Sequence, residues 1–317
     1  MKTYFGNDTL PAEKGVIVTL GTFDGVHRGH LTVLGATATW AREAGVPSAV
    51  LTFREHPRKT LEQRAPELVT TLEHRLVLFE RAKIDVTWVL EFTPELSKLS
   101  ARQFAQQYFV ERLGIRGLQM GFDSRFGSDR MSQDSPELEP LARDMGFEVR
   151  RVTPILSPDG EVISSTKIRE AICDGRFRDA ETMLGRPVSV YGTVIRGDAR
   201  GRRLGYCTAN IDLGQEVRPP FGVYVTIAMV NGVQHGSVTN VGYRPTITQQ
   251  LPNGAKPDLL IETHLFDFNA DLYGQKLEVF FIEKLRDERR FPDVQALVEQ
   301  IKKDEARARA ILAARQG

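Results

Sequence analysis

The sequence has few of the features that mark secreted and membrane proteins. It contains two cysteines, Cys173 and Cys207, in 317 residues. Two cysteines are too few for a disulfide framework, so a reducing compartment fits and we expect a cytoplasmic protein. The first residues lack the apolar segment of a secretory signal, and no apolar run approaches the ~20 residues that span a bilayer. We therefore expect a protein that works without a membrane.

An excess of one sign of charge is also missing. Lys and Arg number 42 against 41 Asp and Glu, which gives a net charge of +1. This balance provides no broad attraction to nucleic acid or to an anionic membrane, although a small basic pocket for a phosphorylated ligand is compatible with it. The chain lacks a Gly-x-x-x-x-Gly-Lys-Ser/Thr segment as well, so it is not a P-loop enzyme. Composition leaves the oligomeric state open.

The first part of the chain alternates short apolar runs with helical patterns. The apolar runs predict strands at 16–20, 48–53, 85–92, 115–121 and 147–152. One helical pattern ends at Gly45, a second begins with Ser100 and Gln103 in the spacing of a capping box. A third has Ser135 as its N-cap and ends at Gly146. This alternation predicts a Rossmann-like, doubly wound parallel sheet, which binds ligands beyond the carboxyl ends of its strands.

The composition changes near Gly185-Arg186-Pro187, where we place a boundary between a domain of residues 1–185 and a domain of residues 186–317. Beyond it, β-branched and aromatic runs predict strands at 191–197, 222–230, 234–242, 259–268 and 276–285. Asn231-Gly232 between two such runs indicates a hairpin turn. Short strands at this density predict a small barrel or sandwich. A single long helix is expected after Pro292.

A glycine-rich segment, GTFDGVHRGH at 21–30, joins the strand at 16–20 to the next helix. Its glycines allow a tight turn and close approach of a ligand. The helix that follows directs free N–H groups and its positive dipole end at the segment, which suits phosphate, and His27 and His30 add donors. A histidine here can also be a simple helix cap. The pair can equally be half of a metal site, but no third ligand lies nearby in the sequence.

A second group of donors, ISSTKIR at 163–169, is expected at a helix N-terminus. It offers three hydroxyls, followed by the charges of Lys167 and Arg169, which can clamp a polyphosphate in a transition state. Ser-Ser-Thr alone is usually a helix cap. Two such segments in one α/β domain favour nucleotide binding.

Together the two segments resemble the nucleotidylyltransferase superfamily, and the form Thr-Phe-Asp-Gly-Val-His resembles the FAD synthetase module of bacterial bifunctional riboflavin kinase/FAD synthetases. The resemblance implies adenylylation of FMN by ATP, with His27 and His30 as catalytic residues. The nucleotide contacts that it implies are Gly21, Phe23, Asp24, Gly25, Gly29, Ser164, Ser165, Thr166 and Arg169. The segment GFDSRFG at 121–127 resembles a ligand loop of the same module, which implies that Asp123 contacts the flavin, with Ser124 where an aromatic residue is common.

In the second half, RGDARGRRLGYCTANI at 196–211 is dense in Gly and Arg and contains Thr208 and Asn210. Their side-chain oxygens are hard ligands suited to Mg²⁺, although a solvated basic turn is the commoner explanation for such a segment taken alone. Further on, Glu262 and His264 lie on one face of a predicted strand. A carboxylate near a Mg-nucleotide can accept a proton from an alcohol, but an exposed cross-strand charge is more frequent.

These later segments resemble the riboflavin kinase domain. GRRLGYCTAN is similar to its signature, with Cys207 in place of the usual proline. VTNVGYRPTI (238–247), ETHLFDF and DLYGQKLEVFFIEKLRDERRF (271–291) match its later segments in order. The resemblance implies that Gly201, Thr208 and Asn210 bind Mg-ATP, the last two through Mg²⁺. It further implies Glu262 as the base and Arg286 at the flavin.

The two resemblances together imply that riboflavin and ATP give FMN, and that FMN and ATP then give FAD and pyrophosphate. Riboflavin, FMN and ATP would be the small-molecule partners, with Mg²⁺ as cofactor and without nucleic acid or membrane. One alternative is a nucleotidylyltransferase for another substrate, against which the β domain argues. The other alternative is a flavin-binding protein with degenerate sites, against which the complete set of His27, His30, Thr208, Asn210 and Glu262 argues.

Overall fold

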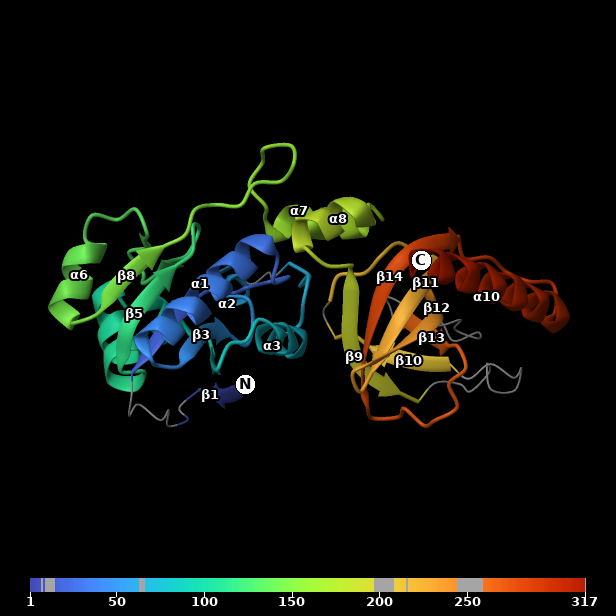
Figure 1. Cartoon of the computed structure of the whole chain (residues 1–317), viewed down its shortest axis with the longest axis horizontal. Helices are drawn as coiled ribbons and strands as arrows, with labels where there is room; N and C mark the ends of the chain where they lie inside the picture. Colours follow the sequence, from blue (N-terminus) through green and yellow to red (C-terminus); the bar gives the residue numbers. More distant parts are fainter. Residues whose placement is uncertain are drawn as a thin grey trace. The chain divides into compact units, whose positions relative to one another are not determined.

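A computed structural model describes residues 1–6, 8, 15–62, 66–196, 208–214, 216–243 and 259–316. The chain divides into two units, Met1–Thr166 and Lys167–Gly317 (Figure 1). This division comes earlier than the boundary at 185/186 that the composition indicated. The reason lies in helix α8 (Phe177–Leu184), whose Phe177 packs against rings of the second unit.

Parallel strands build the sheet of the first unit, in the order β1-β4-β3-β2-β5-β8. The strands are β1 (Lys2–Phe5), β2 (Val16–Leu20), β3 (Ser48–Phe53), β4 (Val86–Leu90), β5 (Ile115–Met120) and β8 (Glu148–Arg151). The doubly wound sheet and its five expected strands are confirmed, while β1 at the edge was not predicted. Strands β2 and β3 are buried over their whole length, as helices on both faces require. A separate ribbon pairs β6 (Arg125–Phe126) with β7 (Met131–Ser132).

Alternate residues of the sheet face different helices. On one face, Leu20 and Leu118 share a core with Phe109, and on the other Ile17 packs with Trp40 and Ala41 of the long helix after β2. The helices of this unit are α1 (Arg28–Ala44), α2 (Arg58–Glu62), α3 (Leu72–Arg81), α4 (Pro94–Lys98), α5 (Ala101–Phe104), the π-helix η1 (Ala105–Arg112) and α6 (Leu138–Met145). Helix α7 (Ser165–Cys173) begins at the end of the unit.

The expected helix ends are confirmed with one exception. Gly45 ends α1 in the left-handed conformation, and Ser100 and Gln103 form the capping box of α5. Helix α6 ends at Gly146 as expected, but Glu137 rather than Ser135 is its N-cap residue. The hydroxyl of Ser135 instead accepts a hydrogen bond from the N–H of Ser132 (3.0 Å), so a local turn uses the oxygen that the helix was expected to use.

The second unit is a closed antiparallel barrel with the strand order β10-β13-β12-β11-β14-β9, which leaves no sheet edge open. The strands are β9 (Ser189–Ile195), β10 (Thr208–Asp212), β11 (Gly222–Val230), β12 (Val233–Tyr243), β13 (Leu259–Leu265) and β14 (Lys276–Arg286). Positive φ angles at Asn231 (49°) and Gly232 (83°) confirm the predicted hairpin turn. Strand β10 was not predicted from the sequence.

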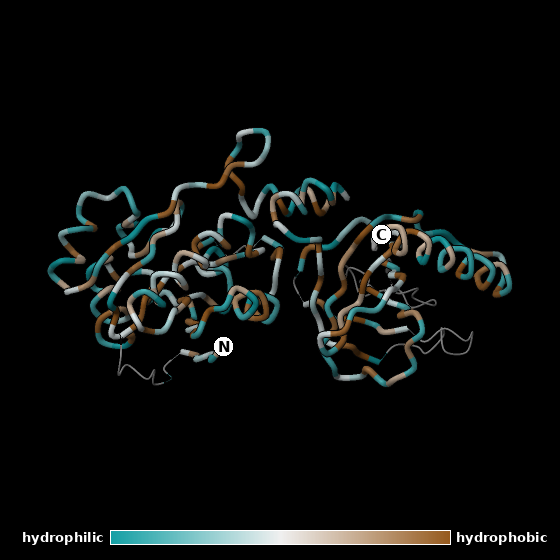
Figure 2. The backbone as a smooth tube through the Cα atoms, viewed as in Figure 1, coloured by the Kyte–Doolittle hydropathy of each residue, from teal (hydrophilic) through white to brown (hydrophobic). Residues whose placement is uncertain are grey.

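A helix packs against the outside of the barrel. The expected C-terminal helix is α10 (Val294–Gln316), and its Ala308 shares an apolar cluster with Val225 of β11 and Val238 of β12. These two valines therefore mark the outer barrel face. The inner face carries Thr239 and Thr263, whose hydroxyl oxygens lie 2.9 Å apart. Figure 2 shows hydrophobic residues in the strands and many hydrophilic ones along α10.

Candidate nucleotide and flavin sites

A cavity of about 830 Å³ opens in the first unit at the carboxyl ends of its strands. Its wall includes Phe53, the last residue of β3, and the residues directly after β2 and β5. Strands β2 and β5 are neighbours, but the chain leaves β2 toward β3 on its other side. In doubly wound sheets, ligands bind in the crevice at such a reversal of strand order. The cavity therefore lies where the sequence predicted a ligand site.

The two predicted catalytic histidines line this cavity side by side. Their rings stack with centroids 3.6 Å apart and an angle of 18° between planes. The side chain of His27 is also the N-cap of α1, because its Nδ1 accepts the N–H of His30 (3.4 Å). The edge of Phe23 packs on His30, with centroids 5.2 Å apart. Helix capping, the simpler interpretation of this motif, thus coexists with a place in the cavity wall.

The glycine-rich segment has an unusual backbone that other residues hold in place. Phe23 (φ 51°), Gly25 (φ 83°) and Val26 (φ 39°) all adopt positive φ. The Thr70 N–H donates to Asp24 Oδ1 (3.0 Å), and the Gly25 N–H donates to Thr70 Oγ1 (2.8 Å). Asp24 is buried. Asp24 thus organises the loop, and its predicted contact with the nucleotide stays a prediction.

The second predicted phosphate segment lies against the first. The hydroxyl of Ser165, the first residue of α7, donates to the carbonyl oxygen of Asp24 (2.8 Å). Ile163 of the same segment is part of the cavity wall. Thr166 is exposed, and Arg169 lies one turn further along α7. The structure therefore joins the two segments, which are separated by more than half of the unit in sequence.

The segment 121–127 forms another part of the cavity wall, where Asp123 is exposed. Ser124 donates its hydroxyl to the carbonyl oxygen of Leu20 at the end of β2 (3.3 Å). A Cβ on Gly121 would lie 2.7 Å from this hydroxyl oxygen. Gly121 therefore leaves room for the bond that ties the ends of β5 and β2 together.

Sequence reasoning missed the aromatic part of the cavity wall. Phe53 and Phe92 meet edge to face there, with centroids 5.3 Å apart, and Phe104 and Phe126 also line the cavity. Such a surface suits a planar aromatic ligand. Phe53 and Phe92 lie at or just after the carboxyl ends of β3 and β4, and this position was the available signal.

In the barrel, the predicted Mg-ATP residues and the predicted base lie on adjacent strands. Thr208 Oγ1 donates to Glu262 Oε1 (2.5 Å), and Asn210 is directly opposite Glu262 in the β10–β13 pair. The structure therefore brings these three residues together. Gly201 and Cys207 lie outside the described residues.

Asn240 extends this row by one strand and was not singled out from the sequence. It lies directly opposite Glu262 in the β12–β13 pair, and its Nδ2 donates to Glu288 Oε1 (3.3 Å). Its Oδ1 is buried without a hydrogen-bond partner among the described residues. Asn240 shares the face of β12 that carries Val238, so the row Asn210–Glu262–Asn240 lies on the outer barrel face.

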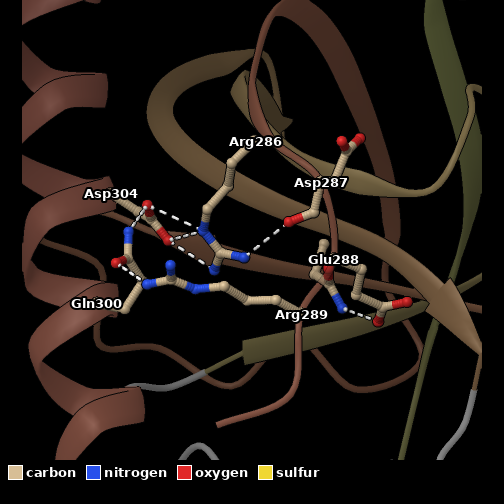
Figure 3. A network of polar contacts seen from close by, with 7 residues as sticks. Arg286, Asp287, Glu288, Arg289, Gln300 and Asp304 are labelled. Carbon is tan, nitrogen blue, oxygen red and sulfur yellow. Dashed lines mark hydrogen bonds and ion pairs between the residues drawn. The ribbon is translucent and has the colours of Figure 1, made fainter.

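Arg286, whose contact with the flavin stays a prediction, makes an ion pair with Asp304 of α10 (Figure 3). Its Nε and Nη2 donate to Asp304 Oδ2 at 2.9 and 2.8 Å, and its Nη1 donates to the carbonyl oxygen of Asp287 (3.1 Å). Gln300 Nε2 donates to the other oxygen of Asp304 (2.7 Å). Figure 3 also shows Glu288, from the same segment as Arg286, turned away from this pair. The structure thus gives the Arg286 guanidinium a structural task.

Among the described residues, no group of three His, Cys, Asp or Glu side chains is arranged to hold a metal ion. Mg²⁺ needs a different donor set, because it binds few protein oxygens and retains several waters. The hydroxyl of Thr208, the amide oxygen of Asn210 and the carboxylate of Glu262 are such oxygens on one barrel face. These residues fit a Mg²⁺ ion that also binds substrate phosphates.

Comparison with protein families assigns both halves of the chain. The family described as FAD synthetase matches residues 10–167, and the family described as riboflavin kinase matches residues 184–312. The bifunctional riboflavin kinase/FMN adenylyltransferase of Haemophilus influenzae is 38% identical over 299 residues, which cover 94% of each chain. The protein of the same description from Bacillus subtilis is 36% identical over 92% of this chain and 91% of its own.

A solved structure has the same fold over nearly the full length. It is described as a macrolide-efflux protein from Streptococcus pneumoniae and is 30% identical, with a TM-score of 0.78 over 98% of this chain and 99% of its own. In the part of the present chain that the structure describes, no helix combines the length and apolar character needed to cross a bilayer.

Proposed function

Because the chain belongs to the family of bifunctional riboflavin kinase/FMN adenylyltransferases, we propose that each of its two units carries one of the two activities. The enzyme converts riboflavin and ATP to FMN and ADP, and FMN and ATP to FAD and pyrophosphate. The FAD synthetase match falls on the first unit and the riboflavin kinase match on the second. The hydrogen bond from Ser165 to Asp24, which joins both phosphate segments at one cavity, supports adenylyl transfer in the first unit most directly.

In adenylyl transfer, an oxygen of the FMN phosphate attacks the α-phosphorus of ATP and pyrophosphate leaves. Such in-line reactions depend on positioning and on stabilisation of charge. We assign the charge stabilisation to His27, His30 and the N–H groups at the start of α1. The second segment supplies Ser164, Ser165, Thr166 and Arg169. The aromatic wall with Phe53 and Phe92 suits the flavin ring, and Asp123 stays a predicted flavin contact.

In the kinase reaction, Glu262 accepts the proton of the ribityl hydroxyl as that oxygen attacks the γ-phosphorus of ATP. Thr208 and Asn210 hold Mg-ATP beside it. The hydrogen bond from Thr208 keeps the Glu262 carboxylate oriented toward β10. When bound, Mg²⁺ neutralises negative charge on the transferred phosphoryl group.

An assay of the purified protein with riboflavin, ATP and Mg²⁺, with chromatographic separation of FMN and FAD, tests the division of activities. His30→Ala should stop FAD formation while FMN accumulates, because the substitution leaves the barrel untouched. His235→Ala, in the barrel and outside the predicted kinase residues, is the matched control. If a folded His30→Ala protein loses both activities, the assignment of one activity to each unit is wrong.

The role of Glu262 has its own test. Glu262→Gln preserves size and hydrogen bonding but cannot take a proton, so FMN formation should fall by about 10²- to 10⁴-fold. FAD formation from supplied FMN should continue. The exposed Glu283 of β14 provides the control substitution Glu283→Gln. A kinase rate within about threefold of the unmodified enzyme would leave Glu262 with a structural role, since the expected range starts at ~10².

Two further assignments follow from the same proposal. We propose that the enzyme works in the cytoplasm, which its small cysteine content and its use of ATP support, with riboflavin, FMN and ATP as its small-molecule partners. The alternative of a flavin-binding protein with degenerate sites predicts that the unmodified protein produces neither FMN nor FAD in the assay above.

A further inference from the structure

A buried arginine outside both phosphate segments contacts the floor of the adenylyl-transfer cavity. Arg75 lies on α3 and is 3% exposed. Its Nη1 donates to the carbonyl oxygen of Thr22 and to Thr52 Oγ1, and its Nη2 donates to the carbonyl oxygen of Phe53 (3.0 Å). These acceptors lie at the carboxyl ends of β2 and β3, and Thr22 and Phe53 belong to the cavity wall. One side chain thus connects the carboxyl ends of the two strands that form this part of the cavity.

The burial of Arg75 is energetically unfavourable for its charged guanidinium. Burial lowers the pKa of the Arg75 guanidinium to about 10, and the nearby Asp24 carboxylate opposes this shift. The hydrogen-bond acceptors described above are neutral oxygens, and Nε is buried without a hydrogen-bond partner among the described residues. Buried charges are usually paired with opposite charge. A guanidinium that binds two main-chain carbonyls at once is therefore placed here for its fork geometry.

The bond to Thr22 lies next to the unusual part of the glycine-rich loop. Phe23, the following residue, has a positive φ although it carries a Cβ, and so does Val26. Such backbone persists only where the surroundings hold it. Thr70, which binds both Asp24 and Gly25, precedes α3 and so comes from the same segment as Arg75. The segment 70–75 therefore holds the loop in place through the hydrogen bonds of Thr70 and Arg75.

We propose that Arg75 is a positioning residue for adenylyl transfer, which holds the carbonyls of Thr22 and Phe53 so that the 21–30 loop keeps the backbone that receives the phosphates of ATP. This inference rests on the proposed function of the first unit. Arg75 does not itself touch the substrate. It acts through the loop, so its loss should change the handling of ATP more than that of FMN.

Arg75→Met and Arg75→Lys test this role in the full-length enzyme. Displacement of a catalytic loop by ~1 Å can cost about 100-fold in rate, so we expect Arg75→Met to lower kcat/KM for ATP by about 10- to 100-fold. KM for ATP should rise and kcat should fall. KM for FMN should stay within about twofold, because Arg75 binds only the main-chain carbonyl of Phe53, while the Phe53 ring of the flavin wall remains packed against Phe92. Arg75→Lys keeps the charge but not the fork, so it should recover folding and less than half of the lost rate.

Two variants serve as controls. Arg81→Met removes an exposed charge from the same helix, and it should leave FAD formation unchanged. Leu113→Ala, in the core on the opposite face of the sheet, should lower the unfolding temperature without raising KM for ATP. FMN formation by the barrel provides an internal control in every variant.

The inference is overturned if folded Arg75→Met retains kcat/KM for ATP within about twofold, far from the ~100-fold that loop displacement can cost. It is also overturned if Arg75→Met, like Leu113→Ala, has a lower unfolding temperature and an unchanged KM for ATP. If Arg75→Met does not fold, Arg75→Lys and Thr70→Val decide by the same measurements, because Thr70→Val removes the acceptor of the Gly25 N–H. If the unmodified enzyme makes no FAD, or His30→Ala still makes it, the proposed function fails instead.

Discussion

The Arg286–Asp304 pair should be a main support of the barrel unit. In Arg286→Met, the carboxylate of Asp304, which is 6% exposed, would retain only the Gln300 amide among the partners shown in Figure 3. Removal of one member of a buried ion pair costs about 3–5 kcal/mol. Because the Arg286 side chain is 20% exposed, we expect the lower end, about 3 kcal/mol. In a unit of this size, that loss lowers the unfolding temperature by roughly 6–12 °C.

Calorimetry of the full-length variants, with the barrel transition followed separately, measures this loss. The double variant Arg286→Met/Asp304→Leu should recover most of it, since apolar replacement of a whole buried pair is often neutral. Arg307→Met is the control, because Arg307 makes an exposed, 3.7 Å contact with Glu283 and such pairs contribute about 0–1 kcal/mol. A loss below about 1 kcal/mol in Arg286→Met, or no recovery in the double variant, would refute the reasoning.

The same double variant tests the predicted flavin contact of Arg286. Its donors are occupied by Asp304 and by the Asp287 carbonyl. We therefore expect the stable double variant to have the same KM for riboflavin as the unmodified enzyme. A KM that stays high in a stable double variant would show that the guanidinium also binds flavin.

Further predictions concern the pH response, the extent of the barrel unit and the cavity loop. Burial raises the pKa of Tyr224 to about 12. Because this value lies above the unfolded value of ~10, the contribution of Tyr224 to the free energy of unfolding is fully present below pH ~10 and is lost as the pH rises toward ~12. The loss is at most about 2 kcal/mol after solvent screening. Tyr224→Phe should remove that part of the pH dependence in urea titrations, and identical curves would contradict it. A fragment 167–317 should resist urea better than 186–317, by about 3–5 kcal/mol, because it retains Phe177 against the barrel rings; equal midpoints would show that α8 is dispensable. Gly127→Ala should reduce FAD but not FMN formation, because its φ is 77° and a Cβ would lie 2.3 Å from the Ala101 nitrogen; unchanged FAD synthesis would mean that the loop adapts.

Most strands could be predicted from the sequence, while β1 and β10 could not. β2 and β3 consist of continuous apolar runs because helices cover both sides. β1 is a four-residue edge strand with exposed ends, too short for a pattern. β10 places Thr208 and Asn210 on one face, so its polar residues resembled a turn. The hydroxyl of Ser135 had two competing uses, and the local turn prevailed.

The candidate sites divide in the same way. The phosphate segments could be found because their donors are contiguous and lie at the start of a helix. The carboxyl end of β3 gave a position for aromatic side chains, but not their identity as a cavity wall. The clamp at Arg75 and the row through Asn240 have no contiguous motif, since their partners lie 53 and 48 residues away in the chain. Only the tertiary structure brings each of them to its partner, so no local sequence pattern could have identified either residue.

These two missed residues share a physical reason for their positions. Arg75 and Asn240 both keep a buried polar atom without a hydrogen-bond partner among the described residues, which folding alone disfavours. Each stands directly behind or beside a proposed reactive group: Arg75 behind the glycine-rich loop, Asn240 opposite Glu262. Both positions fit the demands of the two proposed phosphate-transfer sites, because one site needs a fixed loop backbone and the other a fixed carboxylate.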